Sequence, residues 1–130
     1  SQDFERIGDL AKGNAKKMLP LPQNLPQDLL SSLKRLGNVV DAQLNKSLDA
    51  YIKKSKDIAI EVIRLDTSVN EHTFLAIKEV LAYLSKDQKN LEYATNLLFV
   101  AKNLERAGDH IRRVAENIYY FIEGDYYKKS

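Results

Sequence analysis

Apolar residues recur every three or four positions along most of the chain beyond residue 26. That spacing is typical of one buried face of an α-helix. It predicts three long helices, over residues 27–53, 56–84 and about 91–122. The three apolar stripes are Leu29, Leu33, Leu36, Val40, Leu44, Leu48 and Tyr51; Ile58, Val62, Leu65, Val69, Ala76, Val80 and Leu84; and Leu91, Leu97, Ala101, Leu104, Ile111, Val114, Ile118 and Ile122.

The breaks between these segments predict how the helices connect. A polar stretch follows residue 84, in which Asp87 is placed to cap the next helix, and Gly124 is placed to end the last one. No strand pattern is present, and short connections make consecutive helices antiparallel. We therefore expect an all-α fold, an up-down-up bundle of three helices over residues 27–124, with a tail at 125–130.

The three prolines, Pro20, Pro22 and Pro26, fall within seven residues. Proline lacks a backbone donor and disrupts a helix interior, so residues 20–26 are predicted to be a linker. Residues 1–19 would then form a shorter, separate N-terminal helix.

Composition narrows the possible functions. A chain of 130 residues with 44% hydrophobic and 29% charged residues suits one soluble domain. The net charge of +2 argues against a nucleic-acid binder. The absence of cysteine excludes thiolate metal sites and disulfides. No apolar run approaches the roughly 20 residues that span a bilayer, so we expect no membrane insertion.

One short motif occurs twice. Residues 5–9 read Glu-Arg-Ile-Gly-Asp and residues 105–109 read Glu-Arg-Ala-Gly-Asp. The spacing places Glu5 with Asp9, and Glu105 with Asp109, on one face of a helix. Like charges four residues apart repel, and glycine weakens a helix interior, so the repeat suggests a function. Paired carboxylates are suitable ligands for a hard divalent cation.

A second pair is expected opposite the last motif. If the turn between the last two helices is centred between residues 87 and 88, Asp66 faces Asp109 and Asn70 faces Glu105. These four oxygen donors would form one cluster beside the apolar stripe. The alternative interpretation is a solvated face, on which Glu105 pairs with Lys102 or Arg106 and Gly108 serves helix packing.

The chain resembles the PhoU family. The resemblance rests on residues 104–110, Leu-Glu-Arg-Ala-Gly-Asp-His, and on their counterpart at 4–9, Phe-Glu-Arg-Ile-Gly-Asp. Segments 47–51, 96–103 and 115–124 are also similar to that family. Because PhoU proteins contain two similar three-helix bundles, the resemblance implies that residues 1–19 are the last helix of a first bundle. Residues 27–124 would be the whole second bundle.

The resemblance implies a cytoplasmic, non-enzymatic adaptor that regulates phosphate uptake and damps the phosphate-starvation response. Its partners would be the ATPase of a phosphate ABC transporter and a sensor histidine kinase, and it would form a homo-oligomer. It would also bind a divalent metal ion, with Fe, Zn, Mn and Mg as candidates. The implied ligands are Asp66, Asn70, Glu105 and Asp109, with Glu5 and Asp9 in the first repeat.

Two departures from the family pattern bear on that metal site. Asn70 stands where the family motif usually ends in Asp, which removes one negative charge. Arg112 and Arg113 replace more neutral residues and offer an alternative way to neutralise the carboxylates.

Other residues leave the function open between three classes. His72 is expected to be a core or boundary residue, and His110 points away from Glu105. The tyrosines at 119, 120, 126 and 127 suit either boundary packing or an exposed docking surface. No nucleophile–base pair, phosphate loop or other catalytic signature is visible. The alternatives to a metal-binding adaptor are a carboxylate-bundle metalloenzyme and a purely structural interaction module.

Overall fold

The computed structural model describes residues 27–86 and 88–128. In this part of the chain the helices are α2 (Gln27–Lys53), α3 (Lys56–Lys86) and α4 (Leu91–Glu123), and the 3₁₀ turn η1 (Gln88–Asn90) precedes α4. The predicted all-α class is confirmed, and all three helices lie where the apolar periodicity places them. The expected N-terminal helix, the linker at 20–26, and Glu5 and Asp9 lie outside the described residues.

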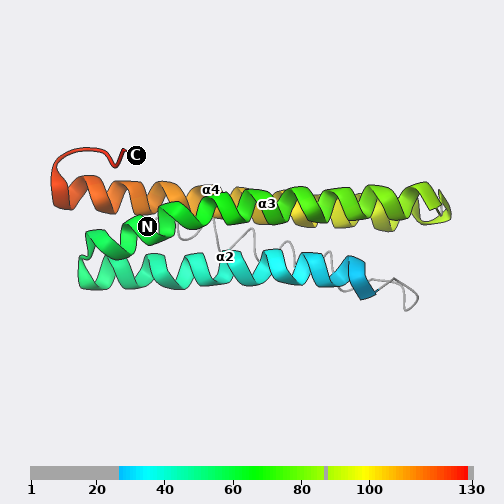
Figure 1. Cartoon of the computed structure of the whole chain (residues 1–130), viewed down its shortest axis with the longest axis horizontal. Coiled ribbons are helices and arrows are strands. Elements are labelled where there is room, and N and C mark those ends of the chain that lie inside the picture. The colour runs from blue at the N-terminus through cyan, green and yellow to red at the C-terminus, as the bar shows by residue number, and fades with distance from the viewer. Residues whose placement is uncertain (1–26, 87, 129–130) are drawn as a thin grey trace.

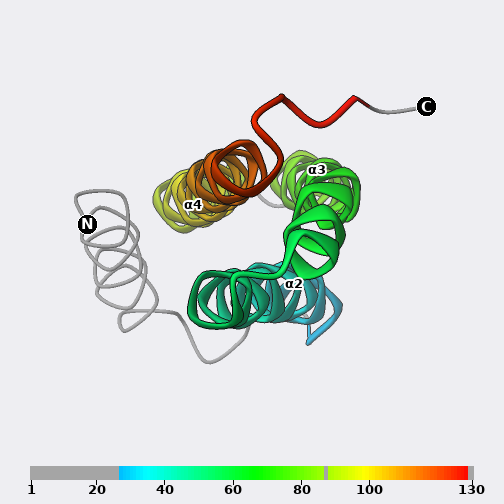
Figure 2. The same ribbon diagram turned by 90° about the vertical axis from the view of Figure 1, so that its left-hand side faces the viewer.

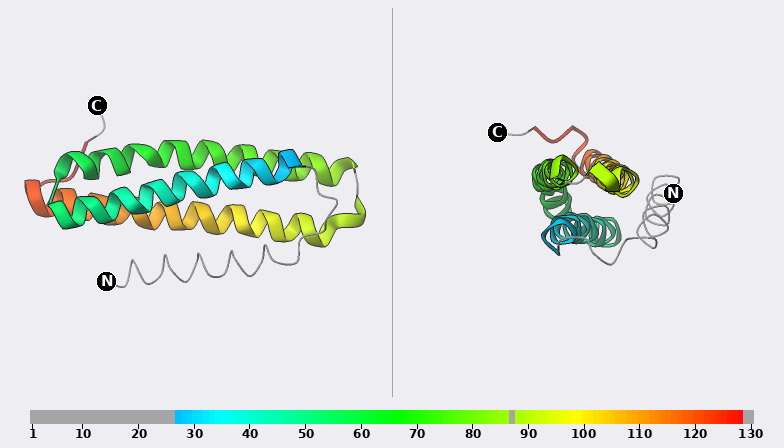
Figure 3. Two further views of the ribbon diagram at one scale, coloured as in Figure 1. Left: turned by 90° about the horizontal axis from the view of Figure 1, so that it is seen from below. Right: turned by 90° about the vertical axis from the view of Figure 1, so that its right-hand side faces the viewer.

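The three helices lie side by side along one long axis and alternate in direction (Figure 1). Viewed along that axis, they occupy the corners of a triangle (Figure 2). Each helix packs against both others, and the arrangement holds along most of their length (Figure 3). The structure is the expected up-down-up bundle.

The core runs along the middle of this triangle. All three helices contribute to it, and its largest fully buried apolar side chains are Leu36, Val62, Val69, Val80, Leu97, Val100 and Ile111. The apolar stripes bury their central residues but not their ends. Leu48, Tyr51, Leu91 and Ile122 are exposed, because each lies within the first or last turns of its helix, where the other helices cover less of its surface.

The two ends of the bundle show how the chain reverses. Lys54, between α2 and α3, has a φ of 50°, and Ser55 accepts a hydrogen bond from the backbone N–H of Ile58 at 3.2 Å. Asp87 lies outside the described residues, and Asn90 immediately precedes α4 without a side-chain capping bond. Gly124 ends α4 in the left-handed conformation, with a φ of 76°, as expected from its position.

Candidate carboxylate site

The sequence-predicted residues Asp66, Asn70, Glu105 and Asp109 line one surface pocket of about 510 Å³ between α3 and α4. Asp66 and Asn70 are one turn apart on α3, and Glu105 and Asp109 are one turn apart on α4. The antiparallel pairing of the two helices brings both pairs to the same height. The expected juxtaposition across the α3–α4 hairpin is therefore present.

Gly108 lets α4 come close to its neighbours beside this pocket. A Cβ atom at Gly108 would lie 2.9 Å from Cγ1 of Val69 on α3 and 3.2 Å from Oε1 of Gln43 on α2. Real Cβ atoms essentially never make the shorter contact, so no side chain fits there without a shift. The interpretation of Gly108 as a helix-packing residue accounts for its presence in the motif.

Arg112 reaches three carboxylates from α4. Its Nη2 donates a hydrogen bond to Oδ1 of Asp109 at 2.6 Å, and its Nη1 donates to Oε1 of Glu116 at 2.7 Å. Its Nε lies 3.3 Å from Oδ2 of Asp66 on α3. The Nε atom is buried and makes no hydrogen bond of good geometry within the described residues, so charge holds this third pair. Arg112 thus links α4 to α3 through the predicted carboxylates.

Other basic side chains pair with the remaining acidic atoms. Nη2 of Arg113 lies 2.9 Å from Oδ2 of Asp109, and Nζ of Lys102 lies 3.1 Å from Oε1 of Glu105. Both cations are more exposed than Arg112, so solvent screens these pairs more strongly. The pairing of Glu105 with Lys102 is the one expected for a solvated face.

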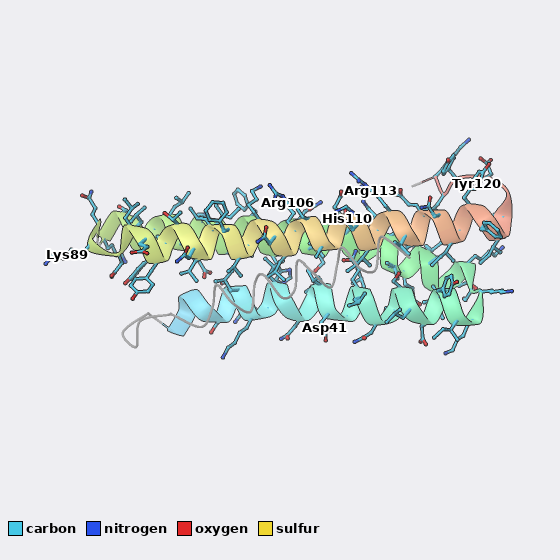
Figure 4. All side chains as sticks on the ribbon, turned by 180° about the vertical axis from the view of Figure 1, so that it is seen from behind. Asp41, Lys89, Arg106, His110, Arg113 and Tyr120 are labelled. Atoms are coloured by element: carbon cyan, nitrogen blue, oxygen red, sulfur yellow. The ribbon has the colours of Figure 1, made fainter. Side chains whose placement is uncertain are left out.

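Arg106, His110 and Arg113 follow one another along α4 at the rim of the pocket (Figure 4). The lining contains three carboxylates and three arginines, which gives it no formal net charge when His110 is neutral. The hydrogen bond to Asp109 raises the pKa of Arg112 above its ordinary value. Attraction by Glu116, Asp109 and Asp66 raises that pKa further, against the opposing effect of burial. Arg112 therefore carries a positive charge at neutral pH.

This arrangement does not fit a metal ion as it stands. The donors are hard oxygens of the kind that Mg²⁺ and Mn²⁺ prefer. In the described parts of the chain, however, no three acidic or histidine side chains are grouped so that they could hold a metal. The guanidinium of Arg112 lies close to both Asp66 and Asp109. Metal binding by these residues stays a prediction.

Sequence reasoning missed Glu116. It completes the cluster by accepting from Arg112, and it lies four residues after that arginine on the same helix face. The signal was therefore present in the spacing. His72 is half-buried, with Nδ1 2.8 Å from the carbonyl oxygen of Ser68, as expected of a boundary histidine.

The C-terminal tyrosines pair across the end of α4. Tyr119 and Tyr127 meet edge to face with their ring centroids 5.4 Å apart, and Tyr120 and Tyr126 stack at 4.6 Å. Arg64 of α3 donates a hydrogen bond to the hydroxyl of Tyr127 at 3.1 Å. The tail after Gly124 is thus packed against the bundle, while Tyr126 keeps an exposed face.

Comparison with known proteins identifies the bundle. The family model described as the PhoU domain matches residues 33–118. The chain belongs to the PhoU family. The matched residues run from the first half of α2 almost to the end of α4 and include the whole candidate site.

The relatives of this PhoU domain are named for phosphate transport. A "Phosphate-specific transport system accessory protein PhoU homolog" from Caulobacter vibrioides is 40% identical over 126 residues, which cover 96% of this chain and 55% of the relative. The Escherichia coli K12 protein of the corresponding name is 30% identical over 122 residues, which cover 94% and 51%. The chain therefore spans about half the length of these relatives.

A solved structure confirms the fold. The phosphate transport system regulatory protein PhoU from Streptococcus pneumoniae superposes with a TM-score of 0.83 at 28% identity. The match covers 98% of this chain and 60% of that one.

Proposed function

We propose that this PhoU domain acts in a cytoplasmic accessory protein that regulates phosphate uptake and damps the phosphate-starvation response. The observation that supports the proposal is the family match over residues 33–118, together with relatives named as phosphate transport accessory proteins. The domain would act by contact with other proteins rather than by catalysis, as an oligomer. Its contacts would be the ATPase of a phosphate ABC transporter and a sensor histidine kinase.

The surface of the domain suits contact with other proteins. None of the helices in the described part of the chain combines the length and apolar character that a bilayer-spanning helix needs. The long sides of the three-helix rod instead present mostly charged and polar residues, with scattered exposed aromatic side chains such as Phe74 and Phe99. Such a surface offers many points at which another protein can be recognised.

A chimaera tests the proposal, because the chain spans about half of its relatives. The matched half of the Caulobacter vibrioides relative would be replaced by this chain and expressed in a host that lacks its own PhoU protein. We expect the chimaera to restore control of phosphate uptake and to repress a phosphate-starvation reporter. A second chimaera with Val62→Asp, which places a charge in the core, should restore neither.

Co-purification separates the two proposed contacts. The transporter ATPase and the sensor kinase, each tested alone, should co-purify with the folded chimaera. A chimaera that is folded and expressed but leaves both uptake and reporter unchanged would overturn the proposed role.

Metal binding at Asp66, Asn70, Glu105 and Asp109 is a separate proposal. It requires the side chain of Arg112 to withdraw from Asp66 and Asp109 first. Elemental analysis of the chain purified without chelator, beside an Asp66→Ala/Glu105→Ala/Asp109→Ala variant, tests it directly. Stoichiometric Fe, Zn, Mn or Mg in the parent but not in the folded variant is the expected result if the carboxylates are ligands.

A further inference from the structure

We propose that Arg112 is the resident cation of the α3–α4 carboxylate cluster, and that it excludes a divalent metal ion from Asp66 and Asp109. The bundle would then be held together at this point without metal. The inference does not depend on the role in phosphate transport. It opposes the separate proposal of metal binding and names the group with which a metal would have to compete.

The contacts of Arg112 carry this inference. Each of its three guanidinium nitrogens lies within 3.3 Å of a different carboxylate: Nη2 near Asp109, Nη1 near Glu116 and Nε near Asp66. A guanidinium presents its donors in a rigid planar fork, which lets one side chain neutralise several acids at once. A metal ion would have to draw its oxygen ligands from the same acids.

Burial makes these contacts stronger than ordinary surface pairs. The side chains of Arg112 and Asp66 are 27% and 16% exposed, whereas Arg113 is 59% exposed. Ion pairs that are partly shielded from water are screened less by solvent and salt. Arg112 and Asp66 also come from different helices, so their pairing fixes α4 against α3 rather than supporting one helix alone.

The charge balance of the pocket agrees with neutralisation by arginine side chains rather than by a metal ion. Asn70 contributes a neutral amide to the lining, and the three carboxylates there face three arginines. A divalent ion added to this neutral set would give it an excess of positive charge, which departure of Arg112 would reduce but not remove. Removing Arg112 would take away the cation that contacts Asp66, Asp109 and Glu116 together, and Arg113 would still pair with Asp109.

The test compares the wild-type chain with Arg112→Met, which keeps much of the side chain's length and apolar stem without the charge. The matched control is Arg113→Met, which removes a neighbouring arginine whose ion pair among the described residues is with Asp109 alone. Each protein would be stripped with chelator. Thermal unfolding would then be followed in EDTA and in increasing Mn²⁺, and Mn²⁺ binding would be measured by titration.

We expect Mn²⁺ to leave the melting temperature of the wild-type chain at its value in EDTA. The same should hold for Arg113→Met, compared with its own value in EDTA. Arg112→Met should melt lower in EDTA, and Mn²⁺ should raise its melting temperature by stabilising the folded state. Removal of a unit charge from a partly shielded cluster should strengthen Mn²⁺ binding by about tenfold or more. Equal Mn²⁺ binding by wild type and Arg112→Met, or no response to Mn²⁺ in either, would overturn the proposal.

A second variant covers the case in which Arg112→Met does not fold without metal. Arg112→Lys keeps one positive charge but lacks the fork that reaches three carboxylates. Its Mn²⁺ affinity should therefore exceed that of wild type, and an affinity no higher than wild type would count against the inference.

The outcomes also separate this inference from the metal-binding proposal. Tight Mn²⁺ binding by wild type with Arg112 in place would sustain metal binding and refute the exclusion. Mn²⁺ binding by Arg112→Met but not by wild type would support the exclusion and refute metal binding by the wild-type cluster.

Discussion

At the scale of single residues, the space around each position decides which residue is tolerated there. A glycine inside a helix costs about 1 kcal/mol relative to alanine. The chain has this cost at Gly108, where Cγ1 of Val69 would be only 2.9 Å from a Cβ atom. Val69 is fully buried and β-branched, so its side chain has little freedom to turn away.

Gly108→Ala should therefore lower the free energy of unfolding by about 1–3 kcal/mol, because the added methyl group overpacks the contact between helices. Gly37→Ala is the matched control, since Gly37 lies inside α2 and the added Cβ would meet no atom within 4 Å beyond its chain neighbours and its own stretch of helix backbone. That control should raise stability by about 0.5–1 kcal/mol. Urea unfolding of both variants measures this contrast. The prediction is wrong if Gly108→Ala is as stable as Gly37→Ala.

Two buried serines of α2 predict opposite effects for one substitution. The hydroxyl of Ser47 is buried without a hydrogen-bond partner within the described residues, whereas the hydroxyl of Ser32 donates to Glu79 of α3. Ser47→Ala should raise the free energy of unfolding by about 0.5–1 kcal/mol, because it removes an unsatisfied polar group. Ser32→Ala should lower it by about 1 kcal/mol, because it breaks a bond to a charged acceptor. Chemical denaturation of the two variants under one set of conditions measures both signs.

At the scale of elements, the ends of the helices depend on backbone conformations that residues with a side chain rarely adopt. Lys54, which joins α2 to α3, has a φ of 50°, and Gly124, which ends α4, has a φ of 76°. Gly124 adopts this left-handed conformation without steric cost, because it has no Cβ atom. Lys54 adopts it against the steric preference of a residue with a side chain.

Lys54→Gly should therefore raise the free energy of unfolding by about 0.5–1 kcal/mol, since glycine adopts positive φ without the penalty that a Cβ atom brings. Gly124→Ala should lower it by about 1 kcal/mol for the same reason. Thermal unfolding of both variants tests the pair, and a loss of stability in Lys54→Gly would contradict the argument.

The helices could be predicted from the sequence because their apolar spacing is a local property. Asp66 and Asp109 could be placed together because two antiparallel helices joined by a short turn have a fixed register. The three-way pairing of Arg112 was harder to predict from the sequence, since it depends on how far α4 is rotated toward α3. The expected alternative, in which arginines neutralise the carboxylates, matches the contacts that Arg112 and Arg113 make.

At the scale of the whole molecule, a single core links the three helices. Leu97 of α4 is among its largest fully buried side chains, and Leu36 and Val69 supply the same core from α2 and α3. A domain of this kind is expected to unfold in one cooperative step. Exposed aromatic residues such as Phe74 and Phe121 take little part in this core.

Leu97→Ala should lower the free energy of unfolding by about 2–5 kcal/mol and shift the entire transition, because it opens a cavity in the shared core. The double variant Phe74→Ser/Phe121→Ser should change stability by only about 0.5 kcal/mol. Circular dichroism during denaturation distinguishes these cases. A second, separate transition in Leu97→Ala would show that the helices do not unfold together.

The side-by-side alignment of the three helices has a spectroscopic consequence. The 33 residues of α4 extend about 50 Å, and backbone N–H bonds in a helix run nearly parallel to its axis. Reversing the direction of a helix leaves the axis along which these bonds lie unchanged. In a weakly aligned sample, residual dipolar couplings from α2, α3 and α4 should therefore share one sign and be large, while those from Asp125 to Lys128 should scatter.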